Sequence, residues 1–320
     1  MKCKPIKITL RENDGSSEAA GKTVVSRTNI EKQMDGFQRK AYLHRKGIDP
    51  NKLFQLDNIF PETMGKRSDL RHIPNDYARS SLFTATNKNQ PRKTLMRKQL
   101  FHYNEYVSII YTGIELRAED DEIVWLQILK YGQGIPLGET FEFSIKDLVR
   151  DVGWSKSGRN YDRVRDCISR LRANDVLALN AKAYGRSGSI CLIGNYEATN
   201  DEEGKPTTYR TWLDPNLILL FAGKNFTSHS WEIFRKLSPV TRCLANYIES
   251  HKHPYPLNLK TFQQMCGSQD SSTTSWRQTV KKACAELQKV KITEIAMLTD
   301  DDKICCIRHE DHDKVPTPLP

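Results

Sequence analysis

The sequence predicts an α+β fold in which two tandem winged helix-turn-helix domains follow a flexible N-terminal arm. The first reason is that one order of elements occurs twice, about 115 residues apart: a short helix, a polar turn, a longer helix and two strand-like runs. The copies begin near Phe141 and Leu257, and Gly153 and Gly267 occupy the same place in them. The second reason is that the first 67 residues are polar and lack a sustained periodicity. In a winged helix the second helix fits the major groove of duplex DNA.

The composition points to a phosphate-rich partner. Of 320 residues, 49 are Lys or Arg and 39 are Asp or Glu, which gives a formal net charge of +10. A basic globular protein of this kind favours nucleic acid as its ligand. The longest apolar run, near residues 217–222, is too short to span a membrane, and the first residues contain no signal-peptide core. We therefore expect a cytoplasmic protein that does not bind membranes.

Composition and turn signals divide the chain into four segments. Residues 1–67 are expected to form the arm, and residues 311–320 form a proline-containing tail. The first winged-helix domain is expected over residues 68–205 and the second over residues 206–310. The boundary is placed in the polar run 200–206, because such runs usually connect domains.

Periodicity places the elements of the first domain. A strand is expected at residues 107–112, a helix at 115–131 and the long helix at 157–172. The strand-like runs 175–183 and 190–196 flank a Gly-Arg-Ser-Gly-Ser turn. They are therefore expected to form the hairpin, or wing, of this domain.

The second domain has the same signals. Ser238 and Pro239 form a cap and first-turn pair that begins a helix, and the long helix is expected at residues 273–290. Residues 291–298 and 303–308 are joined by Thr-Asp-Asp-Asp and are expected to form the second wing.

A helical wheel separates the residues of the first long helix into a core face and a charged face. Tyr161, Val164, Cys167, Ile168 and Leu171 share the core arc, and several arginines lie opposite. Guanidinium groups suit phosphates and the guanine edge, and N-terminal turns usually contact bases. The alternative interpretation is a solvated face on which these arginines pair with aspartates of the same helix. The candidate base contacts are Arg159, Asn160 and Arg163, and the candidate phosphate contacts are Arg165 and Arg170.

The second long helix has a similar arrangement. Trp276 falls on the apolar arc, so it is expected to pack in the core rather than to stack on a base. The opposite face and the first turn carry a short hydroxyl group, an amide and three cations, which suit phosphates and base edges. The candidate DNA contacts of this helix are Ser275, Arg277, Gln278, Lys281 and Lys282.

Catalytic, cofactor and metal sites are not expected. The run from Gly15 to Thr23 has five residues between its glycines, one more than a phosphate-binding loop allows. His251 and His253 flank a lysine at a helix end, with no third ligand in evidence. We therefore expect a DNA-binding protein that is not an enzyme.

Three segments carry a family resemblance. They read IPNDYARSSLFTATNKNQPR at residues 73–92, YTGIELRAEDDEIVWLQILKYGQGIPLGETFEF at 111–143 and SHKHPYPLNLKTFQQMCGSQDSSTTSWRQTVKKACAEL at 250–287. Over roughly residues 70–309 the chain resembles TrfA-type plasmid replication initiators. The resemblance implies a plasmid-associated bacterial protein that binds direct repeats, called iterons, at a plasmid origin and promotes opening of an adjacent AT-rich region.

The same resemblance implies several partners: the host initiator, the replicative helicase, the sliding clamp and a second copy of the chain in a dimer. Binding of single-stranded AT-rich DNA along a basic surface is a further expectation, with Arg92, Lys93 and Lys98 as candidates. The alternative functions are a winged-helix transcriptional regulator that binds an operator and a nicking rolling-circle initiator. Fold alone does not distinguish them.

A short motif in the arm resembles a clamp-binding peptide. Residues 55–60 read Gln-Leu-Asp-Asn-Ile-Phe, against a consensus of Gln-Leu-(Ser/Asp)-Leu-Phe, so the motif has one extra residue. Gln55 offers an amide to the rim of a pocket, and Leu56, Ile59 and Phe60 offer apolar groups. The alternative is a piece of strand or helix that docks on the first domain.

Overall fold

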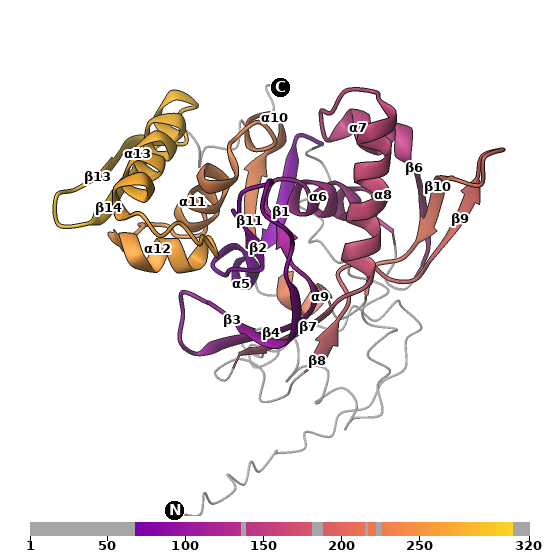
Figure 1. Ribbon diagram of the computed structural model, residues 1–320, viewed down its shortest axis with the longest axis horizontal. Coiled ribbons are helices and arrows are strands. Elements are labelled where there is room, and N and C mark those ends of the chain that lie inside the picture. The colour runs from indigo at the N-terminus through magenta and orange to yellow at the C-terminus, as the bar shows by residue number, and fades with distance from the viewer. Residues whose placement is uncertain (1–67, 136–138, 181–187, 215–216, 222–225, 310–320) are drawn as a thin grey trace, which may run out of the picture. The chain divides into compact units, whose positions relative to one another are not determined.

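Helices and strands alternate along the chain in the computed structural model, and the predicted mixture of both is confirmed (Figure 1). The structure describes residues 68–135, 139–180, 188–214, 217–221 and 226–309. All of these described residues belong to one compact unit. Within this described part, no helix has the length and apolarity required to cross a membrane.

One order of elements occurs twice in the described chain. In repeat 1 it is α6 (Asp121–Tyr131), β6 (Phe141–Ser144), α7 (Ile145–Asp151), α8 (Gly158–Arg172), β9 (Tyr196–Asn200) and β10 (Pro206–Thr211), with two further strands inserted between α8 and β9. In repeat 2 it is α11 (Pro239–Glu249), β12 (Leu257–Asn258), α12 (Leu259–Met265), α13 (Thr273–Lys289), β13 (Thr293–Leu298) and β14 (Lys303–Arg308). The strands pair antiparallel in the orders β6-β10-β9 and β12-β14-β13, so the last strand lies in the centre of both sheets.

The hairpin of repeat 1 differs from the sequence prediction. The strand β7 (Asp175–Asn180) joins a separate four-stranded sheet, of order β3-β4-β7-β8, with β3 (Thr94–Leu100), β4 (Val107–Ile114) and β8 (Gly188–Ile190). The two runs do pair antiparallel, over β7 and β8, so the predicted hairpin is present. It lies outside the sheet of β6, however, so the prediction that it is the wing of repeat 1 is wrong. Strand periodicity does not reveal which partner a strand takes, and β7 takes one far upstream in the sequence. The hairpin that pairs with β6 is β9–β10 (Figure 1).

This pairing also bears on the expected division of the chain. The boundary expected at residue 205 falls in the turn between β9 and β10. These two strands pair with each other and form a hairpin. The polar run 200–206 is therefore the turn of a hairpin rather than a connection between two separate sheets. A long polar turn and a linker have the same composition, so sequence alone could not separate them.

The remaining elements lie before repeat 1 or between the two repeats in the chain. They are β1 (Leu70–Pro74), α5 (Asn75–Ala78), β2 (Phe83–Thr84), β5 (Leu116–Arg117), α9 (Leu217–Phe221), β11 (Phe226–Ser230) and α10 (Trp231–Phe234). The strands β1 and β11 pair antiparallel, and β2 and β5 pair parallel. The helix expected at residues 115–131 begins only at Asp121, because residues 116–117 are in β5 and the Asp120 side chain caps α6.

Matching residues begin and end the helices of the two repeats. The side chains of Ser157 and Ser272 accept hydrogen bonds from the backbone N–H three residues later, at the starts of α8 and α13. Gly153 after α7 and Gly267 after α12 have φ angles of +79° and +61°, a region that favours glycine. A Cβ atom on Gly267 would lie 2.7 Å from Cγ2 of Thr84, so close packing also requires glycine there.

The long helices turn apolar faces into the core, as predicted. The exception is Tyr161, which is only partly buried. Burial of one such aliphatic or aromatic side chain stabilises a fold by roughly 1.5–3 kcal/mol. The buried residues are Val164, Cys167, Ile168 and Leu171 in α8, and Trp276, Val280, Ala283, Cys284 and Leu287 in α13.

Candidate nucleic-acid interface

The outward face of α13 carries three polar side chains without internal partners. Gln278, Lys281 and Lys282 are exposed, and none of them forms a hydrogen bond or ion pair with another described residue. An ammonium group in this situation is free to neutralise a phosphate, and a free amide can donate to and accept from a base edge. This face of α13 therefore has the chemistry of a DNA-contact surface.

The opposite face of α13 is fixed by Trp276. Its indole Nε1–H donates to the backbone oxygen of Leu259 at 3.3 Å, and its ring centroid lies 5.7 Å from that of Phe262. Only 3% of Trp276 is exposed, so the prediction that it packs in the core is confirmed. The anchored indole sets the rotation of α13 about its axis, which directs the three polar side chains outward.

Two other predicted contacts on α13 have different surroundings. The guanidinium of Arg277 pairs with the carboxylate of Asp302, in the turn between β13 and β14. Arg277 therefore ties the helix to its hairpin. Ser275 is exposed in the first turn, where its backbone oxygen accepts a hydrogen bond from the Thr279 hydroxyl at 3.1 Å. The hydroxyl of Ser275 has no partner among the described residues, so it can donate to a phosphate.

Most of the arginines predicted on the exposed face of α8 are instead paired within repeat 1. Arg170 Nε donates to Asp121 Oδ1 at 2.9 Å, and only 13% of the Arg170 side chain is exposed. Arg163 lies 4.1 Å above the Trp154 ring and its Nη2 is 3.4 Å from Glu119 Oε1. The expectation that Arg170 presents a free charge to phosphates is corrected, because the start of α6 covers this face. A wheel describes one helix and cannot show its neighbours.

Of the other predicted residues of α8, two have partners within the fold and one has none among the described residues. Arg165 Nε donates to the backbone oxygen of Pro206 at 3.0 Å and so holds the start of β10. Asn160 Nδ2 donates to the backbone oxygen of Ser155 at 2.8 Å. Arg159 is exposed and has no such partner. Among the candidate residues of α8, Arg159 is therefore the one whose guanidinium is free of contacts with the described chain.

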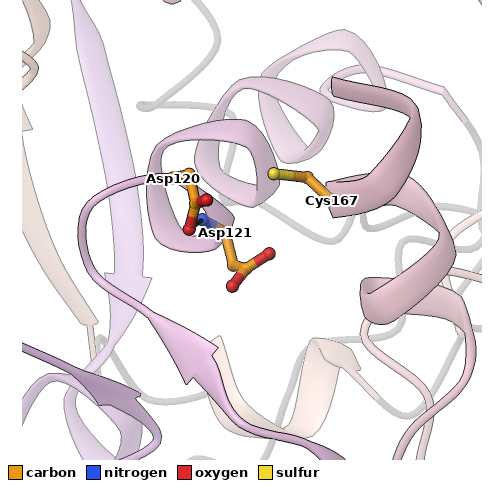
Figure 2. A group of neighbouring side chains, drawn as sticks. All are labelled: Asp120, Asp121 and Cys167. Carbon is orange, nitrogen blue, oxygen red and sulfur yellow. Dashed lines mark hydrogen bonds between the residues drawn. The ribbon is translucent and has the colours of Figure 1, made fainter. Parts of the chain in front are cut away.

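The ion pairs of α8 converge on two carboxylates at the start of α6. Figure 2 shows Asp120 and Asp121 with the thiol of Cys167, from α8, pointing toward them. One ligand atom of each lies within 4.8 Å of the others, a spacing that could hold a metal ion. The guanidinium of Arg92 already bonds both carboxylates, at 2.8 Å to Asp120 and 2.7 Å to Asp121. Arg170 adds a second guanidinium, at 2.9 Å from Asp121.

The two carboxylates belong to a network of ion pairs with Arg92 and Arg170. Burial, together with the neighbouring Asp120, raises the pKa of Asp121 to about 6. Burial opposes ionisation of Asp120 as well, but the Arg92 guanidinium holds the pKa of Asp120 below its usual value. Burial raises the pKa of the Cys167 thiol far above its usual value. The cluster therefore joins α8, α6 and the segment before β3.

The basic residues near β3 separate into anchored and free side chains. Arg92 was expected to capture single-stranded DNA, but its ion pairs with Asp120 and Asp121 engage it inside the fold. Lys93 and Lys98 are exposed, and their side-chain ammonium groups have no partner among the described residues. The clamp-binding candidates are Gln55, Leu56, Ile59 and Phe60, and they lie outside the described residues.

Two grooves follow the two long helices. The first has a volume of about 1150 Å³ and is lined along α8 by Arg159 and Asp166 among others. The second has a volume of about 1000 Å³ and is lined along α13 by Lys282. Lys88 and Glu119 line both grooves, so the segment that carries Lys88 lies between the two helices. Sequence reasoning did not single out Lys88, because its polar surroundings predict a turn without predicting where the turn lies.

Comparisons with known proteins give one family. A family model described as "TrfA protein" matches residues 27–308. The Escherichia coli protein named "Plasmid replication initiator protein TrfA" is 41% identical over 242 residues, which are 76% of this chain and 61% of that protein. The chain thus spans less than two thirds of its relative's length.

Two solved structures of RctB domains 2 and 3 also align with the chain. They have TM-scores of 0.48 and 0.47, and both are 15% identical in sequence. The alignments cover 73% and 71% of this chain, and 98% and 95% of the respective RctB chains.

Proposed function

Because the chain belongs to the TrfA protein family, we propose that it initiates plasmid replication by binding duplex DNA at the origin. In this proposal both repeats are winged helix-turn-helix domains, and α8 and α13 are the helices that enter the major groove. One observation carries it: Gln278, Lys281 and Lys282 are exposed on α13 without internal partners. A helix face with two free cations and a free amide binds phosphates and reads base edges without further rearrangement.

The tandem order of the repeats supports sites arranged in one direction. Both repeats run in the same chain order, so one chain reads two successive patches of duplex with a fixed polarity. Direct repeats, or iterons, present such a composite site several times in one orientation. We propose that binding there bends and unwinds adjacent A·T-rich DNA, with the deformation cost offset by protein contacts. The chemistry proposed is binding alone, without a covalent step.

The test is selection of bound fragments from a random duplex pool, followed by footprinting on origin DNA. We expect the selected sites to recur in one orientation. A palindromic site would instead indicate the transcriptional regulator. Conversion of a supercoiled origin plasmid into relaxed circles with a divalent metal ion would indicate the nicking enzyme. Either result would overturn the proposal.

The contribution of α13 is tested by Lys281→Ala combined with Lys282→Ala. Loss of two phosphate contacts should weaken binding by a similar factor on all duplexes and make the log–log salt dependence less steep by about 1.8. The matched control is Lys289→Ala with Lys291→Ala, which removes the same charge beyond the C-terminal end of this face. Affinity should be measured by fluorescence anisotropy between 50 and 300 mM salt. Equal behaviour of the two variants would contradict the assignment of α13.

We further propose that the protein self-associates as a dimer and acts with the host initiator, the replicative helicase and the sliding clamp. The clamp contact is assigned to the motif at residues 55–60. Leu56→Ala with Phe60→Ala should abolish capture of the chain on immobilised clamp, because it removes the apolar side chains that the motif offers to the clamp pocket. The same change should leave duplex affinity unchanged. The matched control is Leu53→Ala with Phe54→Ala, which removes the same residue types just before the motif. Clamp capture that survives the first pair of changes would refute the assignment and favour a docking role for the segment.

A further inference from the structure

Residues 88–98, which we call the basic ribbon, join the two grooves to the edge of a sheet. Lys88 lines the groove along α8 and the groove along α13. From there the chain enters β3, which pairs only with β4 among the described strands and forms an edge of its sheet. The basic ribbon therefore begins between the two helices proposed to bind DNA.

The charges of the basic ribbon are available to a ligand. Lys88, Lys93, Arg97 and Lys98 are all exposed, and none of their side chains has a partner among the described residues. Arg92 is different, because it is fixed to Asp120 and Asp121 and anchors the ribbon to α6. The ribbon thus has one partly buried anchor and four free cations within eleven residues. Such a density of unpaired positive charge fits a polyanion.

A bulge in β3 places an apolar side chain, that of Met96, within the basic ribbon. The pairing of β3 with β4 shifts register between Leu95 and Lys98, and Arg97 has a φ angle of +46°, which is uncommon for a residue with a Cβ atom. The backbone N–H of Arg97 donates to the Thr112 hydroxyl at 3.1 Å and holds this conformation. Next to it, Met96 is 75% exposed. An apolar side chain displayed among cations is the combination that minor-groove proteins insert between base steps.

We propose that the basic ribbon is a third DNA-binding element, which contacts duplex phosphates between the sites of α8 and α13 and presses Met96 into the minor groove. This inference rests on the proposed function, because it requires duplex DNA along both helices. The edge position of β3 gives access to the duplex, and the bulge sets Met96 and Arg97 apart from the regular strand. The ribbon would bend the duplex between the two major-groove sites. The helices would then supply most of the sequence preference, and the ribbon would supply affinity and deformation.

The phosphate contacts are tested by Lys93→Ala, Arg97→Gly and Lys98→Ala together, on a duplex selected by the wild-type chain. Glycine at position 97 accepts the positive φ angle, so the bulge is kept while the guanidinium is lost. The control is Arg150→Ala, Lys205→Ala and Lys236→Ala, which removes three cations that already pair with carboxylates. We expect the ribbon variant to bind at least tenfold more weakly than the control, with a salt slope less steep by about 2.7. Equal binding of the two variants would overturn the inference.

The role of Met96 is tested by Met96→Ala, with Met96→Leu as the matched control. An inserted side chain kinks duplex by roughly 20–90°. Fluorescence energy transfer across the bound site should therefore show a bend smaller by at least about 20° for the alanine variant and a retained bend for the leucine variant. An unchanged bend in the alanine variant would remove Met96 from the proposal. Thermal melting of each variant separates loss of contact from loss of folding.

Failure of this inference can be distinguished from failure of the proposed function. If the wild-type chain selects no duplex site, the proposed function fails, and the ribbon contact fails with it. If the wild-type chain selects a site and the Lys281 and Lys282 variant loses it, the proposed function stands. In that case a ribbon variant that binds and bends DNA like its control refutes the ribbon alone. A ribbon variant that loses only single-stranded DNA also refutes the duplex contact.

Discussion

The helices α8 and α13 occupy the same place in their repeats but use their charges in opposite ways. On α8, Arg163 and Arg170 pair with acidic residues at and just before the start of α6. On α13, Lys281 and Lys282 have no partner among the described residues. The same topology therefore holds one helix whose arginines stabilise the fold and one whose cations are available to a ligand. Position in the fold does not by itself make a helix a DNA-binding element.

The two helices agree in how they hold their hairpins. Arg165 of α8 donates to the backbone oxygen of Pro206, the first residue of β10. Arg277 of α13 pairs with Asp302, the residue just before β14. In each repeat an arginine of the long helix thus fixes the start of the last strand. The hairpin contact is therefore common to both repeats, whereas the free cations differ: α13 presents Lys281 and Lys282, and α8 presents Arg159.

The largest expected difference between the helices is in stability. Arg170→Met should lower the free energy of unfolding by about 3 kcal/mol, because it leaves Asp121 buried with one guanidinium fewer. Lys281→Met should change it by less than about 0.5 kcal/mol, because that side chain is exposed and unpaired. Urea denaturation followed by circular dichroism measures both. Equal stability of the two variants would show that α8 and α13 do not differ in this way.

A double variant controls for the origin of this effect. Arg170→Met combined with Asp121→Asn removes both charges of the pair. Its loss of stability should be smaller than the sum of the two single losses, since each single change leaves a charge without its partner. Additive losses would place the effect of Arg170 in packing rather than in its ion pair.

The next expected difference is in base preference. Gln278→Ala should reduce the discrimination at one base pair by about 1–3 kcal/mol, because an amide contact to a base edge is lost. Arg159→Ala, the corresponding change at the free guanidinium of α8, should produce the smaller effect, since the rest of its helix face is engaged internally. Binding to a panel of single-base variants of the selected site measures both. A larger effect at Arg159 would reverse the ranking of the two helices.

The smallest expected difference concerns the hairpin contacts that the repeats share. Arg165→Ala and Arg277→Ala should each lower the free energy of unfolding by about 1 kcal/mol or less, because these partly exposed bonds are screened by solvent. Thermal unfolding provides the measurement. Similar values would support a common role in the two repeats, and a loss several times larger for one of them would show that its hairpin depends on that bond alone.

Sequence reasoning was accurate where a structural feature depends on residues close in the chain. The core face of α13 follows from its 3.6-residue period, and the cap at Ser238 follows from a hydroxyl group next to unsatisfied N–H groups. The hairpin β13–β14 is also confirmed, because its two strands are joined by a short turn and pair with each other. These features require only local hydrogen bonds and side-chain direction.

Sequence reasoning was inaccurate where strand pairing or ion pairing depends on a residue far away in the sequence. The strand β7 pairs with β8 across the predicted turn, but it also pairs with β4, about 65 residues earlier, and this places the hairpin in another sheet. Arg170 has the spacing of an exposed residue but pairs with Asp121, which is 49 residues away in the chain. A helical wheel and a strand pattern use only the residues of one element. Neither can therefore predict a contact with an element far away in the sequence.

The sequence alone determined the repeated order of helices and strands, the buried face of each long helix and an excess of positive charge. Tertiary structure decided which of those charges form ion pairs inside the fold and which remain unpaired at the surface. It also decided which hairpin pairs with β6. The physical reason is that helical periodicity and capping are local properties of the backbone. Ion pairing and strand pairing depend on which distant groups folding brings within a few ångströms.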